Sequence, residues 1–360
     1  MQQRRRRARI ADVALAAGVS KTAVSFAFNQ PDRLAPETVL RIREIAEQLG
    51  YRPHPVARML SQRRTRTVGV VVPQALSVVF SNPFIGAFSE GVARVVEEEG
   101  YGLMFISPLY GSLARAIDRA TVDGLVAIGL SAHHPELDHI RQSGLPMVLV
   151  DSSPLPDTPS VDVDDEGGAR AAARHLIELG HRGFLVLAVE PPPPATRHDP
   201  EGVLARRLLG YRAAAAEHGL EIPDESVVVG PATIDGGAAA FQRALARGIR
   251  PTAVLAMSDA MAIGAMRAAA DLGLSVPGDL SVVGFDDIDL ARQVHPALTT
   301  VHQPVRRKGE EAVRLLLSVL DGRERVTEHR RLETRLIVRA STGPAPSRDH
   351  LATAVGGGAG

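Results

Sequence analysis

The sequence contains no cysteine and no tryptophan, and only 4% of its 360 residues are aromatic. Without cysteine there can be no disulfide, no zinc–cysteine site and no thiol nucleophile, which is typical of proteins in a reducing cytoplasm. No apolar run approaches the ~20 residues that cross a bilayer, and no apolar segment follows the arginine-rich start. We therefore expect a cytoplasmic chain with neither a membrane span nor a secretory signal.

Lysine is almost absent as well, because Lys21 and Lys308 are the only two. The net charge of +0 hides an asymmetry: residues 1–66 carry 14 lysines and arginines against 5 acids, a net of +9, which leaves −9 for the remainder. A basic head on an acidic body indicates that the head binds a polyanion. The alternative is a solubilising tail, which the run Arg4–Arg7 alone would not exclude.

Residues 10–29 have the pattern of two short helices joined by a tight turn. Gly18 can end the first helix in a left-handed conformation, and Ser20 can cap the second. Apolar residues recur at helical spacing, namely Val13, Ala14 and Ala17 in the first helix and Val24, Ala27 and Phe28 in the second. The pattern predicts a helix-turn-helix, with an ordinary helical hairpin as the structural alternative.

A third helix should begin near Pro36, where proline suits the first helical position, and end at Gly50. The segment that follows opens a further helix at Pro55 but allows only about a turn and a half. So short a helix is unstable alone in water and needs a second copy or DNA as its partner. A plain linker over residues 55–66 is the alternative.

The head contains Asp12-Val-Ala-x-x-Ala-Gly-Val-Ser20, Val24-Ser25, Asn29, Gly50-Tyr51-x-Pro53 and Ala57-Arg58-x-Leu60. In this order the motifs resemble the DNA-binding head of the lactose/galactose-repressor (LacI/GalR) family. The resemblance implies double-stranded operator DNA as partner, read in the major groove by α-helical side chains and in the minor groove by the hinge. Candidate DNA-binding residues are Lys21, Thr22, Ser25, Phe26, Asn29, Arg33, Ala57, Arg58 and Leu60.

Three positions depart from the family pattern. Phe26 stands where arginine is common, which changes the operator sequence that we expect. Ala35 replaces a serine that often caps the third helix, and His54 replaces an asparagine that often precedes the hinge. These last two affect local stability more than function.

The body alternates β-branched runs with alanine-rich helical stretches, which predicts parallel sheets with helices on both faces. Predicted strands cover residues 67–72, 102–106, 124–128, 146–150, 184–189, 253–257 and 280–285. Predicted helices cover residues 84–99, 167–179, 236–247 and 259–272, and a helix between 107 and 122 should be short. The length of the body favours two similar α/β lobes, each with a doubly wound parallel sheet.

The body also resembles the family's effector domain, which is like periplasmic sugar-binding proteins. The motifs are Asn82-Pro83-Phe84, Val122-Asp123-Gly124, Leu179-Gly180-His181-Arg182, Ser258-Asp259-x-Met261-Ala262-x-Gly264, Val283-Gly284-Phe285-Asp286-Asp287 and Leu298-Thr299-Thr300. The fold class is thus a small all-α head and hinge helix followed by a two-lobed α/β domain. The domains that we expect are a basic arm at 1–7, the helix-turn-helix domain at 8–54, the hinge at 55–66, lobe 1 at about 67–162 and 290–322, lobe 2 at about 163–289 and 323–341, and a disordered tail at 342–360.

Polar residues follow several of the predicted strands, where ligands of such folds bind. The resemblance implies an effector pocket lined by Phe84, Asp151, Arg207, Ser258 and Asp286. Carboxylates and a guanidinium suit a hydroxyl-rich ligand because each can bind vicinal groups in pairs. The alternative for each residue is helix capping or a salt bridge between the lobes. A sugar is the family's usual effector, although scarce aromatics leave few stacking platforms.

We find no catalytic motif: there is no Gly-x-Ser-x-Gly elbow and no phosphate-binding Walker loop. The cluster His133, His134, Glu136, Asp138 and His139 fits a solvated loop and helix start better than a metal site. We therefore expect no enzyme activity, no metal and no cofactor. The sequence predicts a homodimeric repressor controlled by a small molecule; the rivals are a solute-binding transport protein and an enzyme on an α/β scaffold.

Overall fold

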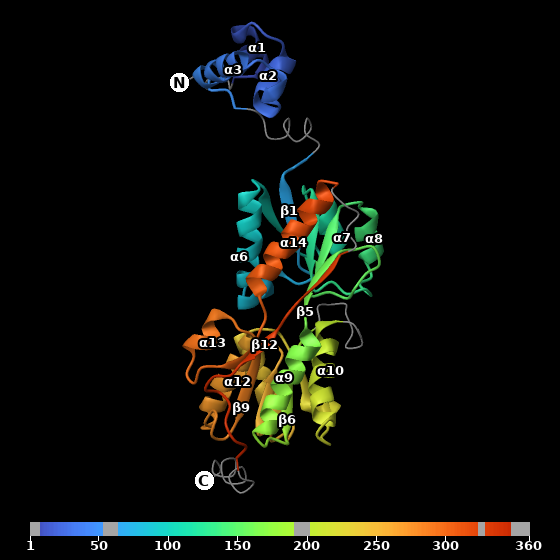
Figure 1. Ribbon diagram of the computed structural model, residues 1–360, viewed down its shortest axis with the longest axis vertical. Coiled ribbons are helices and arrows are strands. Elements are labelled where there is room, and N and C mark those ends of the chain that lie inside the picture. The colour runs from blue at the N-terminus through green and yellow to red at the C-terminus, as the bar shows by residue number, and fades with distance from the viewer. Residues whose placement is uncertain (1–7, 53–63, 191–201, 323–327, 347–360) are drawn as a thin grey trace. The chain divides into compact units, whose positions relative to one another are not determined.

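The computed structural model describes residues 8–52, 64–190, 202–322 and 328–346, and the chain divides into two compact units, Met1–Arg66 and Thr67–Gly360 (Figure 1). Several predictions lie outside the described residues. They are the basic arm at 1–7, the hinge contacts Ala57, Arg58 and Leu60, and most of the tail.

The head contains three helices, α1 (Ile10–Ala17), α2 (Lys21–Asn29) and α3 (Pro36–Gln48), with a 3₁₀ turn η1 (Pro31–Arg33) before α3. Gly18 ends α1 with φ +64°, and the Ser20 hydroxyl accepts a hydrogen bond of 3.1 Å from the Ala23 N–H. The chain bends by 103° between α1 and α2, as in a helix-turn-helix. The predicted motif is therefore present.

A small apolar core holds the head together. Its buried residues are Val13, Ala14, Ala17, Val24, Ala27, Val39, Ile42 and Ala46. Phe28 packs at the margin of this core, with its ring 5.9 Å from that of Tyr51 in an edge-to-face contact. This packing leaves the opposite face of α2 toward solvent.

The body has two six-stranded sheets, one in each lobe. The first has the order β11-β5-β4-β3-β1-β2, with β1 (Thr67–Val71), β2 (Gly102–Ile106), β3 (Gly124–Ile128), β4 (Met147–Val150), β5 (Ser160–Val163) and β11 (His329–Leu332). The second has the order β12-β10-β9-β8-β6-β7, with β6 (Phe184–Val189), β7 (Val227–Gly230), β8 (Ala253–Ala256), β9 (Ser281–Asp286), β10 (Thr299–His302) and β12 (Arg335–Ile337). All pairings are parallel except that of β10 with β12.

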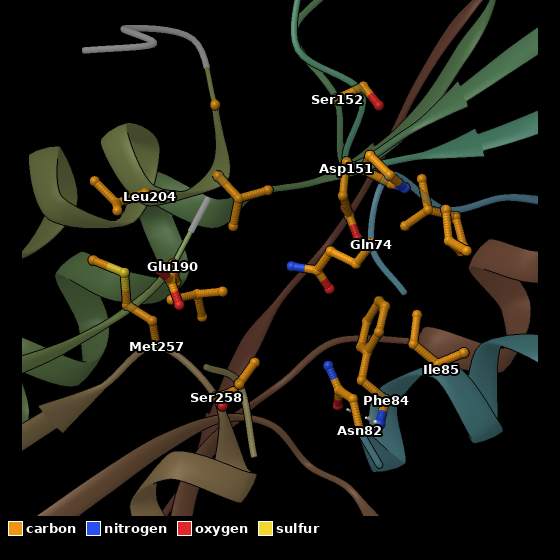
Figure 2. Close-up of a pocket in the computed structure, with 18 of the residues that line it drawn as sticks. Gln74, Asn82, Phe84, Ile85, Asp151, Ser152, Glu190, Leu204, Met257 and Ser258 are labelled. Atoms are coloured by element: carbon orange, nitrogen blue, oxygen red, sulfur yellow. Dashed lines mark hydrogen bonds between the residues drawn. The ribbon is translucent and has the colours of Figure 1, made fainter. Parts of the chain in front are cut away.

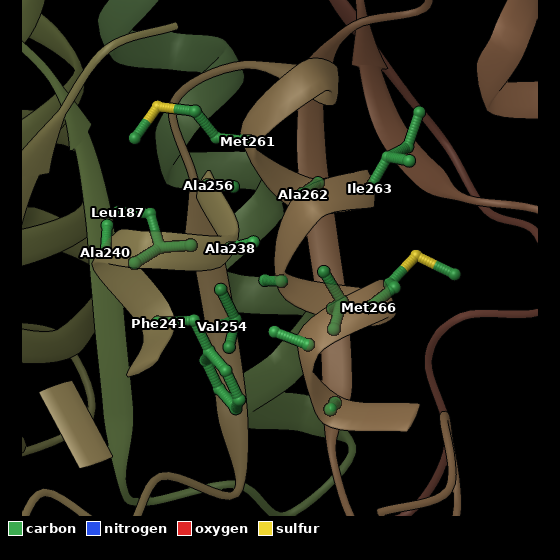
Figure 3. Close-up of a cluster of buried hydrophobic side chains, with 14 of the residues drawn as sticks. Leu187, Ala238, Ala240, Phe241, Val254, Ala256, Met261, Ala262, Ile263 and Met266 are labelled. Carbon is green, nitrogen blue, oxygen red and sulfur yellow. The ribbon is translucent and has the colours of Figure 1, made fainter. Parts of the chain in front are cut away.

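Helices accompany both sheets. In lobe 1 they are α5 (Leu76–Val79), α6 (Pro83–Glu98), α7 (Leu113–Arg119), α8 (Leu137–Gln142) and α14 (Val305–Leu320). In lobe 2 they are α9 (Asp165–Glu178), α10 (Val203–Ala216), the 3₁₀ turn η2 (Asp224–Ser226), α11 (Ile234–Ala246), α12 (Asp259–Asp271) and α13 (Asp289–Gln293). Each sheet has apolar clusters on both faces, which explains why its strands read as continuous apolar runs. Figure 3 shows one of these clusters, which joins Leu187 of β6 and Val254 of β8 to Phe241 of α11 and Met266 of α12.

The lobe boundaries predicted from sequence need two corrections. Strand β10 pairs with β9, so residues 290–302 continue lobe 2, and lobe 1 resumes only with α14. Strand β11 pairs with β5, so it belongs to lobe 1, and lobe 2 resumes at β12. Both strands are short and carry polar residues, so apolar runs do not reveal them, and only their pairing assigns them to a sheet.

Residues 342–346, which the sequence places in a disordered tail, are bonded to lobe 2. The Ala345 N–H donates to the Leu179 carbonyl at 2.9 Å, and His175 Nε2 lies 2.9 Å from the Thr342 hydroxyl. These anchors are polar, and a search for apolar anchors misses them. Among the described residues no single helix is long and apolar enough to span a membrane, and the strongly bent pair α1 and α2 meets that test only by joint length and composition.

Candidate functional sites

The outward face of α2 presents the candidate base-reading residues of the head. Lys21 and Thr22 are exposed in its first turn, while Ser25 and Asn29 are half-buried. Asn29 Nδ2 donates to the Ser25 hydroxyl at 3.3 Å. These four side chains therefore share the face of α2 that lies away from the core of the head, and their hydrogen-bonding groups suit base edges in a groove.

Phe26 lies on the same face and is half-exposed. The guanidinium carbon of Arg33, in η1, lies 5.1 Å from the centre of the Phe26 ring, close enough for a cation–π contact. Arg33 thus has a defined neighbour in α2, although its sequence position after the helix gave no sign of it.

A pocket of about 220 Å³ lies in the body, where residues that follow the strands of both sheets meet. All five candidate effector residues line it: Phe84 and Asp151 from lobe 1, and Arg207, Ser258 and Asp286 from lobe 2. Figure 2 shows Phe84, Asn82, Gln74 and Asp151 on one side, with Ser258, Met257 and Glu190 on the other. The structure therefore brings together residues that are up to 202 positions apart in the sequence, from Phe84 to Asp286.

Two strand-end aspartates of the pocket have unusual backbones. Asp151 follows β4 with φ +48°, and Asp286 ends β9 with φ +128°. A non-glycine residue in this region costs about 1–3 kcal/mol and persists where the surroundings enforce it, most often at functional sites. Both aspartates are at least nine-tenths buried, with 8% and 5% of their surface exposed.

Ser258 and Phe84 are placed by helix starts. The Ser258 hydroxyl caps α12 by accepting a 3.2 Å bond from the Met261 N–H, so its capping role and its place in the pocket coexist. Asn82 caps α6 in the same way through the Phe84 N–H, at 3.0 Å. The side chains of Ser258 and Asn82 are therefore held in place by the helices that they cap.

Arg207, on α10, is held by contacts inside lobe 2 and also lines the pocket. Its Nε donates to Asp165 at 2.8 Å, its Nη1 donates to the Met257 carbonyl, and its guanidinium lies 3.6 Å from the Phe285 ring centre. Burial alone would lower the pKa of Arg207, but the neighbouring Asp165 and Asp286 carboxylates outweigh it and raise that pKa. The arginine is therefore charged and fixed.

For Asp286 and Asp259 a raised pKa has the opposite meaning, because it disfavours their charged form. Burial raises the pKa of Asp286 to about 6, although Arg207 and Gln303 partly oppose this. Burial, reinforced by the Asp286 charge, raises the pKa of Asp259 to about 8. Asp259 accepts hydrogen bonds from the Ile288 N–H at 2.9 Å and from the Thr300 hydroxyl. These carboxyl groups thus hold protons more tightly than exposed ones do.

Sequence reasoning missed Gln303 and Lys308. Lys308 Nζ lies 2.7 and 2.8 Å from the two carboxylate oxygens of Asp151 and also donates to Gln303 Oε1. Gln303 Nε2 donates in turn to Asp286 at 2.6 Å. A continuous polar chain therefore joins the Asp151 end of β4 in lobe 1 to the Asp286 end of β9 in lobe 2.

The His133–His139 segment contributes to capping. Glu136 accepts bonds from the Ser112 hydroxyl and from the N–H groups of Leu113 and Ala114, at the start of α7. His139 Nε2 lies 3.1 Å from Asp118. Across the part of the chain that the structure describes, no group of three or more His, Cys, Asp or Glu residues could hold a metal ion.

Comparison with known families gives two matches. Residues 9–54 match bacterial regulatory proteins of the lacI family, and residues 173–342 match a periplasmic binding protein-like domain. The HTH-type transcriptional regulator CelR of Thermobifida fusca is 33% identical over 348 residues, which are 94% of this chain and 99% of that protein.

Solved structures give the same result. A CelR–cellobiose complex matches with a TM-score of 0.68 and 32% identity, over 93% of this chain and all of that one. A lac repressor dimer bound to operator and the anti-inducer ONPF matches with a TM-score of 0.78 and 26% identity, over 94% of this chain and all of that one. The head-plus-two-lobes architecture is therefore shared along almost the whole chain.

Proposed function

This chain belongs to the lacI family of bacterial regulatory proteins, and we propose that it represses transcription by binding a near-palindromic operator as a homodimer, under the control of a small molecule in the body pocket. The observation that carries the proposal is the pocket itself. Five residues singled out by sequence line one cavity between the lobes, while the head presents a polar helix face on a unit with net charge +9.

The head residues have distinct roles in this proposal. Lys21, Thr22 and Phe26 read base edges in the major groove, with Ser25, Asn29 and Arg33 as further contacts on the same side of the head. Ala57, Arg58 and Leu60, outside the described residues, would contact DNA from the hinge. Two heads related by a two-fold axis would recognise two half-sites, so the operator should be near-palindromic.

The relatives favour a regulator over both rival functions. The similar proteins are named as transcriptional regulators, and neither an enzyme nor a transport protein is among those compared above. We extend the proposal to a sugar or sugar derivative as effector and, because bacterial chromosomal DNA lies there, to the cytoplasm as location. The pocket residues Phe84, Asp151, Arg207, Ser258 and Asp286 would contact that effector.

Operator binding by the full-length chain tests the DNA half of this proposal. Each phosphate that the head neutralises adds about −0.9 to the slope of log affinity against log salt concentration. A gel-shift or fluorescence titration over a salt series should therefore give a steep negative slope, and Lys21→Ala should weaken binding. Arg212→Ala, on α10 in the body, removes the same charge and should leave operator affinity unchanged. A flat salt dependence would contradict the proposal.

The effector half is tested by a thermal-shift screen of metabolites, followed by operator titrations with each hit. A ligand that binds only the folded chain raises its melting temperature by mass action. At least one hit should also change operator affinity, because control requires a ligand that favours one lobe arrangement over the other.

A further inference from the structure

Lys308 is one of only two lysines in the chain, and its side chain is fully buried, with 0% exposed. It lies on α14, where that helix approaches α6 closely. An added Cβ at Gly309 would lie 2.4 Å from the Phe88 carbonyl oxygen, and one at Gly91 would lie 1.9 Å from the Arg306 carbonyl oxygen. Backbone contact therefore fixes this part of α14 against α6 (Figure 1).

The lysine has no N–H to spare for a ligand. An ammonium group has three donors, and those of Lys308 meet the two carboxylate oxygens of Asp151 and Gln303 Oε1. Its nitrogen also lies 5.3 Å from the centre of the Phe84 ring. Lys308 is thus positioned behind the pocket wall and holds three residues that line the cavity.

Gln303 extends this contact to the second lobe. It is buried, with 2% exposed, and lies on the crossover between β10 of lobe 2 and α14 of lobe 1. Its amide accepts from Lys308 and donates to Asp286, so its orientation is set at both ends. One lysine thereby orders pocket groups on both sides of the cavity.

The three cations around the cavity are each paired with an acid, and the four acids outnumber them by one. The cations are Arg206, Arg207 and Lys308, and the acids are Asp151, Asp162, Asp165 and Asp286. Asp165 contacts Arg207 at 2.8 Å and Arg206 at 2.9 Å, while Lys308 contacts Asp151. Glu190 is also in the lining but is exposed to water.

The rest of the wall is largely apolar. It includes Val72, Val79, Ile85, Leu204 and Met257. A ligand that brought an anionic group into such a wall would lose its hydration and would find the three cations already engaged by acids. An uncharged ligand avoids that cost and can still accept or donate hydrogen bonds at Ser258, Asp286 and Asp151.

We propose that Lys308 is the built-in counter-ion of this pocket and that it makes the pocket selective for an uncharged effector over phosphate esters and carboxylates. The second clause rests on the proposed function, because it assumes that the pocket binds an effector. The first clause concerns the protein alone. Lys308 is a positioning residue, which acts through Asp151, Gln303 and Phe84 without touching the ligand.

The ligand-free test uses the full-length chain and three variants, Lys308→Met, Asp151→Asn and the double variant. Lys308→Met leaves the Asp151 carboxylate buried without its counter-ion, and burial then favours the protonated acid. Its melting temperature should therefore rise relative to wild type as the pH is lowered from 8 to 5. The double variant, with a neutral pair, should recover stability at pH 8 and lose this pH dependence.

A purely structural role gives a different result. If Lys308 only fills space, the melting temperature of Lys308→Met should differ from that of wild type by the same amount at every pH. The double variant should then be no more stable than the single one. That result would overturn the proposal. Should Lys308→Met fail to fold at pH 8, refolding at pH 5 and the behaviour of the double variant still separate the two outcomes.

The ligand test uses glucose, glucosamine and glucose 6-phosphate, together with the hits of the metabolite screen and their amino and phosphate counterparts. Wild type should bind the uncharged member of each such set more tightly than the phosphate member. Lys308→Met should shift the preference toward the amino member by at least ~10-fold, because the ammonium of the ligand can replace the missing lysine. Tighter binding of a phosphate ester to wild type would overturn the selectivity. A screen with no hits would count against the proposed function, while the ligand-free comparison would still decide the role of Lys308.

Discussion

At the scale of single residues, Asp259 offers a direct test of buried charge. Its carboxyl group is buried beneath the first turn of α12, and burial raises its pKa to about 8. In the unfolded chain the group ionises near pH 4. Between these values the folded state holds a proton that the unfolded state has lost, so stability from this group is present at low pH and falls as the pH rises toward 8.

Asp259→Asn should therefore flatten the dependence of melting temperature on pH. The asparagine Oδ1 can accept from the Ile288 N–H while its Nδ2 donates to the Thr300 hydroxyl, and the side chain carries no ionisable proton. Between pH 5 and pH 8 the melting temperature of the variant should rise by several degrees relative to that of wild type, since about 1 kcal/mol corresponds to roughly 2–4 °C in domains of about 150–250 residues. Asp271→Asn, at the exposed end of the same helix, is the matched control. Parallel curves for Asp259→Asn and wild type would contradict the prediction.

Some residues of the pocket can be recognised from the sequence alone, and others cannot. Asp151, Ser258 and Asp286 each follow an apolar run, so their strand-end positions could be read from the sequence and then placed in the pocket. No apolar strand directly precedes Lys308 or Gln303, so this pattern does not identify them. Lys308 follows two arginines near the start of an amphipathic helix, where a basic residue normally indicates a solvated face, and only the packing of α14 on α6 buries it.

At the scale of elements, α2 carries a specific prediction through Phe26. Phenylalanine cannot make the paired hydrogen bonds that arginine makes to guanine, but it can pack on a thymine methyl group. The nearby Arg33 guanidinium, 5.1 Å from the ring centre, contacts the same side chain. Selection of bound sequences from random DNA should therefore favour A·T at the contacted step.

The matched variant is Phe26→Arg. It restores the residue common in the family, and the preferred base at that step should change to guanine, with a discrimination of about 1–3 kcal/mol for a good paired contact. A guanine requirement in wild type would refute the prediction. Thr38→Ala, on α3 outside the α2 face, controls for general effects on the stability of the head.

Elements differ in how far the sequence specifies them. Strands such as β1, β3 and β8 are apolar runs buried on both faces, and their positions could be predicted within a residue or two. Strand β10 has the sequence Thr299-Thr-Val-His302, and β11 is His329-Arg-Arg-Leu332. Neither has an apolar run, and each forms because a neighbouring strand offers unpaired backbone groups. Such strands are determined by tertiary pairing, which local propensity does not contain.

At the scale of the whole molecule, the sequence was enough to predict a two-lobed α/β body. It was not enough to predict where the chain passes from one lobe to the other. The crossings depend on which sheet accepts β10 and β11, and therefore on contacts between distant segments. One of these crossings, from β10 to α14, carries Gln303. The segment that links the two lobes therefore also links Asp286, through Gln303 and Lys308, to Asp151. Residues that bind a ligand at this point are also well placed to sense the arrangement of the lobes.

Arg207 and Asp286 should accordingly control the response to effector while sparing operator binding. Asp286→Asn keeps the contact with Gln303 but removes the charge, and Arg207→Ala removes the guanidinium altogether. A hydrogen bond to a charged group contributes on the order of 2 kcal/mol, so effector affinity should fall by at least ~25-fold. Each variant is titrated with a confirmed effector against a fixed operator complex. Arg212→Ala, a half-exposed position on the same helix as Arg207, serves as control.

The two variants also distinguish a binding role from a structural one. Arg207→Ala leaves Asp165 buried with Arg206 as its nearest cation, so its melting temperature has to be measured alongside the titration. Asp286→Asn should destabilise the fold less than Arg207→Ala does. Burial already raises the pKa of Asp286 to about 6 and disfavours its charge, so removing that charge leaves no strongly favoured ion behind. If both variants respond at wild-type effector concentrations, these residues do not form the effector site. If both lose operator binding without ligand, they act as structural bridges between the lobes, and the ligand must be sought elsewhere in the cavity.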